Sequence, residues 1–434
     1  MWGAQRSFPR AIMHVDGDSF FASCEIAKDP SLRGKAVITG KERGIVSSMS
    51  YEARRLGVRR AMPLHEIAKK FPQAIILPSD YETYSIVSRR MYEIVRRYTP
   101  AVEEYSIDEC FADLTGLRRV HHRGYEEIAA AIKHDMEREL GMTFSLGLSC
   151  TKTLAKIGSK WKKPDGLTTI RLGDAPAFLR ETSIGKIWGI GPNTAAHLEK
   201  LGVKSAYDFT QRSAAWVEAH TSKPYQGIWH ELQGRVVNEL DTEGRETYQS
   251  ISKTKTFTPP SRDEKFVFAE LSKNIENACI KARRWDLATK EIFFFLKTQE
   301  FRYHGCEVKL SHPTAIPQEI LAQVARYFPQ VFRAGVQYRA TGVTLMKLSD
   351  ARTVQLDLFG AVLKSEGLKQ VFASVDEMSA RYGKHIVFLA SSLKSIDRRV
   401  HEGERGGPST VTAPRFRGET MRRRLGITYL GEVA

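Results

Sequence analysis

AIMHVD, at residues 11–16, is a short apolar run that has no helical period and contains β-branched residues. These features predict a buried strand that ends at Asp16. A second acidic site, Asp108 and Glu109, lies in the middle of residues 101–114, which we interpret as a hairpin with the acids at its bend. If the two strand ends lie side by side, three carboxylates come together.

Three neighbouring carboxylates repel one another, and a divalent cation relieves that repulsion. With two Mg²⁺ ions, the group would become a clamp for the attacking and leaving oxygens of an in-line phosphoryl transfer. Taken alone, Asp16 fits a solvated turn residue equally well. The neighbouring segments therefore decide between the two interpretations.

Two helices are predicted close to these acids in the sequence. The first starts near residue 18 and has Asp18 or Ser19 as its candidate N-cap. The second is short and ends with Gly57 at the C′ position. On it, Tyr51 and Arg54 share a face and offer a hydroxyl and a forked guanidinium to phosphate oxygens. The alternative for this pair is an ordinary exposed helix.

Four motifs together resemble, in order and spacing, the Y-family translesion DNA polymerases. They are VDGDSFF at 15–21, YEAR at 51–54, SIDE at 106–109 and KPDG at 163–166. The resemblance covers about residues 10–350. The first part of the chain is more similar to bacterial polymerase IV, whereas the later part is more similar to the catalytic (UmuC-type) subunit of polymerase V.

The resemblance implies a role for each acid. Asp16 and Asp108 would bridge both Mg²⁺ ions, Glu109 would bind the catalytic ion, and the carbonyl of Gly17 would contact the nucleotide-bound ion. Asp16, Asp108 and Glu109 are thus the expected catalytic residues.

The resemblance also implies a nucleotide site. Tyr51, Arg54 and Lys163 would hold the triphosphate, and Phe21 would be the steric gate beneath the sugar. Small hydroxyl residues near the base imply a loosely enclosed base pair. The full expected set is Phe20, Phe21, Ser47, Ser48, Tyr51, Arg54 and Lys163.

The predicted fold is a multidomain α+β right hand. A ferredoxin-like β-α-β-β-α-β palm would occupy residues 1–24 and 80–168, with small fingers inserted at 25–79. A length of 434 residues agrees with this, because a chain of that size is expected to form about three or four domains.

A helical thumb is predicted at residues 169–245. It would contain a helix-hairpin-helix in which Gly189 and Gly191 present backbone N–H groups to phosphate. Just before it, Lys152, Lys156 and Lys160 fall at i, i+4 and i+8. A bound phosphate would relieve the repulsion between these charges, so we predict that they bind DNA. A solvated charged face is the alternative.

A little finger is predicted at residues 250–350, as a four-stranded sheet with two helices. Its strands are expected near 253–257, 291–297, 306–310 and 339–345, and its helices near 266–286 and 317–328. Phe293 to Phe295 are expected to be core residues and not to stack on bases.

The last segment, 351–434, would bind partners. Gln355, Leu356, Leu358 and Phe359 resemble the bacterial sliding-clamp-binding motif. A helix at 363–382, a strand at 384–389 and a basic end follow, through which an accessory subunit or a recombinase filament could bind.

The composition fits this interpretation. A net charge of +16 indicates a polyanionic partner, although membrane or RNA binding would fit the charge equally well. The five cysteines are widely spaced without a Cys-x-x-Cys pair, which indicates neither zinc nor disulfides and favours the cytoplasm. No apolar stretch approaches 18 residues, so neither a cleaved signal nor a membrane span is expected.

The sequence therefore predicts a template-directed, Mg²⁺-dependent DNA polymerase that performs translesion synthesis with low fidelity and without proofreading. A nucleotidyl cyclase could use a similar palm, but it would need no DNA-gripping domain. A catalytically silent DNA-binding scaffold would be expected to have lost an acid, whereas all three acids are present.

Overall fold

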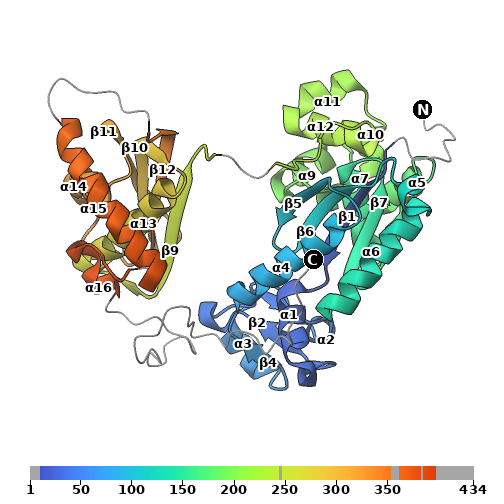
Figure 1. Cartoon of the computed structure of the whole chain (residues 1–434), viewed down its shortest axis with the longest axis horizontal. Coiled ribbons are helices and arrows are strands. Elements are labelled where there is room, and N and C mark those ends of the chain that lie inside the picture. The colour runs from blue at the N-terminus through green and yellow to red at the C-terminus, as the bar shows by residue number, and fades with distance from the viewer. Residues whose placement is uncertain (1–9, 244–246, 353–360, 383–384, 397–434) are drawn as a thin grey trace. The chain divides into compact units, whose positions relative to one another are not determined.

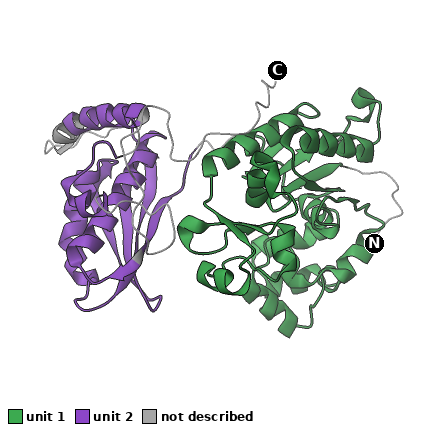
Figure 2. Cartoon of the chain, turned by 90° about the horizontal axis from the view of Figure 1, so that it is seen from below, with its two compact units in different colours: residues 1–244, 422–434 green, residues 245–421 purple. Residues whose placement is uncertain are grey.

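The computed structural model describes residues 10–243, 247–352, 361–382 and 385–396 (Figure 1). These residues form two compact units, one ending at residue 243 and the other beginning at residue 247 (Figure 2). The Gln355, Leu356, Leu358 and Phe359 peptide lies outside the described residues.

The central sheet of the first unit has the predicted ferredoxin-like order. Its strands run β5-β6-β1-β7-β8, and the first four form antiparallel pairs while β8 pairs parallel with β7. The strands are β1 (Ile12–Gly17), β5 (Val102–Ser106), β6 (Glu109–Asp113), β7 (Phe144–Ser149) and β8 (Leu167–Thr169). The helices that connect them are α1 (Phe20–Lys28), α4 (Tyr81–Arg96), α5 (Arg118–His121) and α6 (Tyr125–Leu140). The predicted fold class is confirmed.

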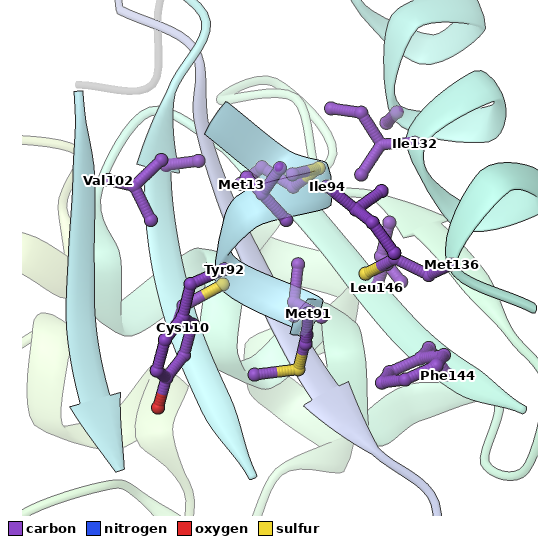
Figure 3. Close-up of a cluster of buried hydrophobic side chains, with 14 of the residues drawn as sticks. Met13, Met91, Tyr92, Ile94, Val102, Cys110, Ile132, Met136, Phe144 and Leu146 are labelled. Carbon is purple, nitrogen blue, oxygen red and sulfur yellow. The ribbon is translucent and has the colours of Figure 1, made fainter. Parts of the chain in front are cut away.

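The main core of this unit lies between the sheet and helices α4 and α6. Met13 of β1 and Leu146 of β7 meet Met91 of α4 and Ile132 of α6 there, all fully buried (Figure 3). Because successive side chains of a strand point to opposite faces, Ile12, His14 and Asp16 lie on the other face of β1, which a different element covers.

That partner is helix α7 (Lys152–Trp161), which lies unusually close to the sheet. A Cβ on Gly147 of β7 would lie 1.9 Å from the carbonyl oxygen of Ala155. Only glycine permits this approach, which brings the lysines of α7 toward the strand ends that carry the acids.

The insertion between α1 and α4 forms a small domain with its own core. Its sheet has the order β3-β2-β4, and Ile38 of β2 packs with Val46, Ala53 and Ile67 in a buried core. Its elements are η1 (Pro30–Leu32), β2 (Val37–Thr39), η2 (Lys41–Arg43), β3 (Ser48–Met49), α2 (Tyr51–Arg55), α3 (Leu64–Lys70) and β4 (Ile75–Leu77). The predicted short helix is confirmed, with Ser50 as its N-cap and Gly57 at φ +99° after its end.

A helical region with a separate core completes the first unit. It contains α8 (Ala175–Glu181), η3 (Ile184–Lys186), α9 (Pro192–Lys200), α10 (Ala206–Thr210), α11 (Ala214–His220) and α12 (Lys223–Leu232). Helix α9 begins at Pro192 and is followed by Gly202 at φ +77°, as the helix-hairpin-helix pattern predicts.

The second unit is a four-stranded antiparallel sheet of order β11-β10-β12-β9 with helices packed on it. Its elements are β9 (Ile251–Ser261), α13 (Glu264–Arg283), β10 (Leu287–Thr298), β11 (Tyr303–Thr314), α14 (Pro317–Val331) and β12 (Tyr338–Asp350). Phe294 is fully buried in its core, as predicted. The same prediction is wrong for Phe293 and Phe295, which point to the opposite face because side chains alternate along a strand.

The C-terminal part of the second unit contains α15 (Ala361–Tyr382), η4 (Ala390–Ser392) and α16 (Leu393–Ile396). The predicted strand at 384–389 is wrong for its described part, residues 385–389. The backbone N–H of Leu389 donates to the Glu276 carboxylate of α13, and Ser392 donates to the same carboxylate. The segment is thus held by side chains of a helix instead of by a strand ladder. Within the described residues, no helix is long and apolar enough to cross a membrane.

Candidate active site

The three acids lie at one edge of the first unit's sheet, as the sequence predicts. Asp16 at the end of β1 is the register partner of Glu109 at the start of β6. The backbone N–H of Gly17 donates to the carbonyl oxygen of Asp108 at 2.8 Å, which ties the end of β1 to the β5–β6 bend. Antiparallel pairing thereby brings together acids from distant parts of the chain.

Each acid already has a polar partner. Lys163 binds Asp16, Lys156 binds Glu109 at 2.6 Å, and the Ser106 hydroxyl donates to Asp108 at 2.7 Å. Among the described residues, no group of three or more His, Cys, Asp or Glu side chains is arranged to hold a metal ion.

The electrostatics of Asp16 nevertheless fit a cation. Burial raises the pKa of Asp16 to about 6, Lys163 partly offsets that effect, and the nearby Glu109 and Asp108 add to it. The carboxylate is therefore destabilised as an anion although a lysine contacts it. An all-oxygen donor set of this kind suits Mg²⁺.

Asp18 is hydrogen-bonded to several of the segments that surround the acids. The prediction that it caps the following helix is wrong. It is 1% exposed and accepts hydrogen bonds from Ser145 at 2.8 Å and from the Asp165 backbone N–H at 2.8 Å. The Tyr51 hydroxyl donates to it at 3.4 Å, and the Lys163 ammonium lies 3.7 Å away. Ser19, the other candidate cap, has left-handed backbone geometry and makes no capping bond.

The structure brings together the residues expected at the triphosphate. Tyr51 and Lys163 both approach Asp18, and the Arg54 guanidinium lies over the Tyr51 ring at 4.7 Å. Arg54 is exposed and so is available to an anionic ligand. Burial, with the Asp18 charge as a second cause, raises the pKa of Tyr51 to about 12, so the hydroxyl stays protonated and can donate.

The residues expected near the sugar and base differ in how far they are buried. Phe21 is half-buried and stacks on Tyr84 with ring centroids 4.5 Å apart, which fixes its position. Phe20 is 3% exposed and belongs to the core, so it is not presented to a ligand. Ser48 donates to the carbonyl oxygen of Ser19 at 3.3 Å, and Ser47 is buried beside it.

Two of the three α7 lysines that are predicted to bind DNA are buried in the structure. Lys152 and Lys156 are each 5% exposed and form ion pairs with Glu103 and Glu109. The close approach of α7 to β7 buries them, and the two carboxylates relieve their mutual repulsion. Lys160 alone of the three is exposed.

Tyr105 and Trp188 contact the lysine that pairs with Glu109, and the sequence did not predict either as a site residue. The Lys156 ammonium lies 4.4 Å from the Tyr105 ring centroid and 5.2 Å from that of Trp188. The indole N–H of Trp188 donates to the Tyr105 hydroxyl at 2.9 Å. Since Trp188 directly precedes Gly189, these contacts join the helix-hairpin-helix to the acidic edge. The spacing of residues in the sequence carries no signal for such a long-range contact.

The two glycines of the hairpin have the predicted local geometry. Gly189 has φ +88°, and Gly191 is the N-cap of α9 with no atom within 4 Å of where a Cβ would lie. The backbone at the start of α9 is therefore open to solvent.

Three family models match this chain. Residues 15–160 match the impB/mucB/samB family, residues 248–358 match its C-terminal domain, and residues 173–203 match the HHH motif of the same family. The chain is 32% identical to a DNA polymerase IV of Desulfatibacillum aliphaticivorans over 89% of this chain and 97% of that protein. It is 34% identical to a DNA polymerase IV of Xanthomonas axonopodis pv. citri over 81% of this chain and 98% of that protein.

A solved structure is similar as well. The Y-family DNA polymerase chimera Dbh-Dpo4(243-245)-Dbh superimposes with a TM-score of 0.66 at 26% identity, covering 78% of this chain and 98% of the chimera. A second, the post-insertion binary complex of Dbh DNA polymerase, has a TM-score of 0.53 at 25% identity and covers 78% of this chain and 98% of that one.

Proposed function

The chain belongs to the Y family of DNA polymerases, and on that premise we propose how its own residues carry out template-directed translesion synthesis. The observation that carries the proposal is the juxtaposition of Asp16, Asp108 and Glu109 with the phosphate-binding candidates Tyr51 and Lys163. A primer 3′-hydroxyl and a nucleoside triphosphate would meet between these two groups. We expect synthesis of low fidelity without proofreading.

Asp16, Asp108, Glu109 and the Gly17 carbonyl would hold two Mg²⁺ ions. When bound, the ions supply charge neutralisation at the transferred phosphoryl group and lower the pKa of the attacking hydroxyl. Lys163 and Lys156 form ion pairs with two of the same carboxylates and offset part of their mutual repulsion.

The triphosphate would be held by Tyr51, Arg54 and Lys163. Asp18 would act as a positioning residue, because it contacts the Tyr51 hydroxyl and lies close to the Lys163 ammonium. Phe21, held against Tyr84, would exclude a 2′-hydroxyl, and Ser47 and Ser48 would lie near the base.

The DNA itself would be held mainly without sequence readout. The exposed Lys160 and the open backbone at Gly189 and Gly191 are suited to phosphate contacts. Lys152 and Lys156 would contact phosphate only after leaving their carboxylates. The peptide Gln355, Leu356, Leu358 and Phe359 would bind the sliding clamp, and an accessory subunit or a recombinase filament is a further proposed partner. All five cysteines are free thiols, which supports a cytoplasmic location.

Primer extension with Mg²⁺ on undamaged and damaged templates tests the proposal. Asp108→Asn should remove nearly all nucleotide incorporation because it removes one cation-binding charge, while primer-template affinity stays within about threefold because phosphate contacts supply it. Asp113→Asn is the matched control, since Asp113 lies at the other end of β6 and pairs with Arg10. Full activity in Asp108→Asn would refute the assignment of this site.

A further inference from the structure

One lysine beside the acidic edge is held in a buried aromatic enclosure. Lys156 of α7 is 5% exposed, and its ammonium forms an ion pair with Glu109 at 2.6 Å. The ammonium also lies 4.4 Å from the ring centroid of Tyr105, 5.2 Å from that of Trp188 and 5.9 Å from that of Phe111. Rings at these distances attract a cation, and the attraction is strongest where water is excluded.

A bulge in strand β5 places one of these rings beside Glu109. The register between β5 and β6 shifts between Glu104 and Ser106, so Tyr105 is an extra residue in the ladder. Bulges often redirect a side chain next to an active site. The indole N–H of Trp188 donates to the Tyr105 hydroxyl at 2.9 Å, which holds the two rings together. Backbone geometry and a side-chain hydrogen bond thus build the enclosure.

Lys152, one turn earlier on α7, offers a comparison. It is also 5% exposed and forms an ion pair with Glu103, and its ammonium has a second acceptor in the carbonyl oxygen of Glu239 at 3.3 Å. Within the described residues, Glu109 is the one hydrogen-bond acceptor of the Lys156 ammonium. Lys152 therefore fits a purely structural role, whereas Lys156 pairs with a carboxylate that the proposed reaction needs.

The other two lysines near the acids differ from Lys156 in their surroundings. Lys163 pairs with Asp16 and is expected to hold the triphosphate, so a bound nucleotide would give its charge a new partner. Lys160 is exposed, and solvent screens its charge. Neither applies to Lys156, because the packing of α7 against β7 and the three rings keep its ammonium at Glu109.

A cation that binds Glu109 must therefore bind next to a buried positive charge. We propose that Lys156 lowers the affinity of the catalytic divalent cation, because its ammonium competes for the Glu109 carboxylate and repels the ion. Lys156 is then a positioning residue that acts through Glu109. The phosphates of the primer and the nucleotide would outweigh this charge, so the cation would be held firmly only after both have bound. The inference rests on the proposed function, which assigns Glu109 to that cation.

The test measures Mn²⁺ binding to the full-length protein without DNA or nucleotide. Electron paramagnetic resonance reports the concentration of the free ion, and work at pH 8 keeps the carboxylates ionised. Lys156→Gln keeps a hydrogen-bond donor on the side chain but removes its charge. It should bind Mn²⁺ about tenfold more tightly or better, which is the effect that one nearby charge has on proton binding by a carboxylate.

A double-mutant cycle assigns the gain in affinity to the proposed pair. In a Glu109→Gln background, most of the gain from Lys156→Gln should disappear, because the carboxylate for which the ammonium competes is gone. Lys152→Gln is the matched control, since it removes an equally buried charge from the same helix but leaves the Glu109 pair in place. It should leave Mn²⁺ affinity nearly unchanged. Lys156→Met, a second variant with an uncharged side chain, should show the same gain as Lys156→Gln.

Unchanged or weaker Mn²⁺ binding in both Lys156 variants would overturn the proposal. An equal gain in Lys152→Gln, or a gain that persists in the Glu109→Gln background, would overturn it as well. Primer extension with Mg²⁺ by the unchanged protein is measured in parallel. Intact extension with no gain in Mn²⁺ affinity rejects this inference alone, whereas absent extension in the unchanged protein rejects the proposed function.

Discussion

At the scale of single residues, Asp18 connects three segments that are distant in the sequence. Its carboxylate receives the Ser145 hydroxyl from β7, the Asp165 N–H from the loop after α7, and the Tyr51 hydroxyl from the inserted domain. The two oxygens of the side chain carry enough lone pairs to accept from all of these donors. The side chain therefore orders phosphate-binding candidates without needing to touch the reacting atoms.

Asp18→Asn should separate positioning from catalysis. The amide keeps the size of the side chain but turns an NH₂ group toward at least one N–H or O–H donor, so Tyr51 and Lys163 lose part of their support. We expect KM for the incoming nucleotide to rise about tenfold, a loss typical of one charge-assisted hydrogen bond, with a smaller change in kcat. Steady-state insertion kinetics measure both quantities.

Ser23→Ala is the control for this variant, because the Ser23 hydroxyl donates to the backbone carbonyl of Asp18 and not to its carboxylate. It should leave KM unchanged. A fall in kcat with constant KM in Asp18→Asn would show that Asp18 takes part in the chemistry itself.

Asp16 should make folding stability depend on pH. Its pKa is raised to about 6 from an ordinary value of 3.8, chiefly by burial, so the folded protein holds this proton more tightly than the unfolded chain does. Between these pH values unfolding releases the proton, so the free energy of unfolding falls as pH rises. This loss of stability is complete above about pH 6. We therefore expect the free energy of unfolding of the unchanged protein, measured in EDTA, to fall relative to that of Asp16→Asn between pH 4 and pH 6.

Above pH 6 the difference between the two proteins should become constant. Added Mg²⁺ should then stabilise Asp16→Asn less than it stabilises the unchanged protein, because the variant keeps only the Asp108 and Glu109 carboxylates for the cation. A difference that stays the same from pH 4 to pH 8 would mean that Asp16 titrates normally.

At the scale of elements, the position of helix α7 against the sheet depends on Gly147, which has no side chain. Gly147 allows the helix backbone to lie against β7, and this places Lys156 at Glu109. Gly147→Ala would place a Cβ 1.9 Å from the Ala155 oxygen and 2.3 Å from the Ser159 nitrogen. Because both are backbone atoms, the whole helix must move.

We expect Gly147→Ala to lower the free energy of unfolding by about 3 kcal/mol, at the upper end of overpacking costs, and to reduce nucleotide insertion as well. Urea denaturation measures the first effect. Gly173→Ala is the control, since no atom lies within 4 Å of its Cβ position and its φ is not in the left-handed range. Equal stability of the two variants would mean that α7 can shift at little cost.

These elements also show what local sequence can and cannot reveal. The strand at Asp16, the hairpin and the helix after Ser50 follow from periodicity and caps, and the structure contains all three. The burial of Lys152 could not be predicted, because it results from the approach of two glycine-containing elements. Three consecutive phenylalanines likewise gave no indication of which ring points inward until the register of β10 was known.

At the scale of the whole molecule, each of the two units has its own apolar core. The first unit contains the acids and the nucleotide candidates, while the second is a four-stranded sheet with helices packed on it. A net charge of +16 over the chain favours association with any nucleic acid and makes binding depend steeply on salt. Affinity that rests on charge alone does not keep an enzyme at a primer end, so a separate tether would extend synthesis.

The proposed tether is the peptide from Gln355 to Phe359. The elements on either side of it belong to one unit: β12 ends at Asp350, and α15 is held to α13 by the ion pair between Asp376 and Arg283 at 2.6 Å. A clamp bound to this peptide would hold the whole enzyme at high effective concentration on DNA without adding a catalytic contact. Replacing Leu358 and Phe359 with Ala should therefore abolish clamp-stimulated synthesis, because it removes the apolar anchors.

Single-nucleotide insertion without the clamp should stay intact in that variant, since none of its changes touches the acids or the triphosphate residues. The measurement is product length with and without clamp on the same primer-template. Val371→Ala is a suitable control, because it removes an exposed apolar residue of α15 beyond the peptide and should leave clamp stimulation unchanged. If stimulation survives in the Leu358 and Phe359 variant, or if clamp-free insertion falls equally, the tether lies elsewhere and the peptide serves the fold of the second unit.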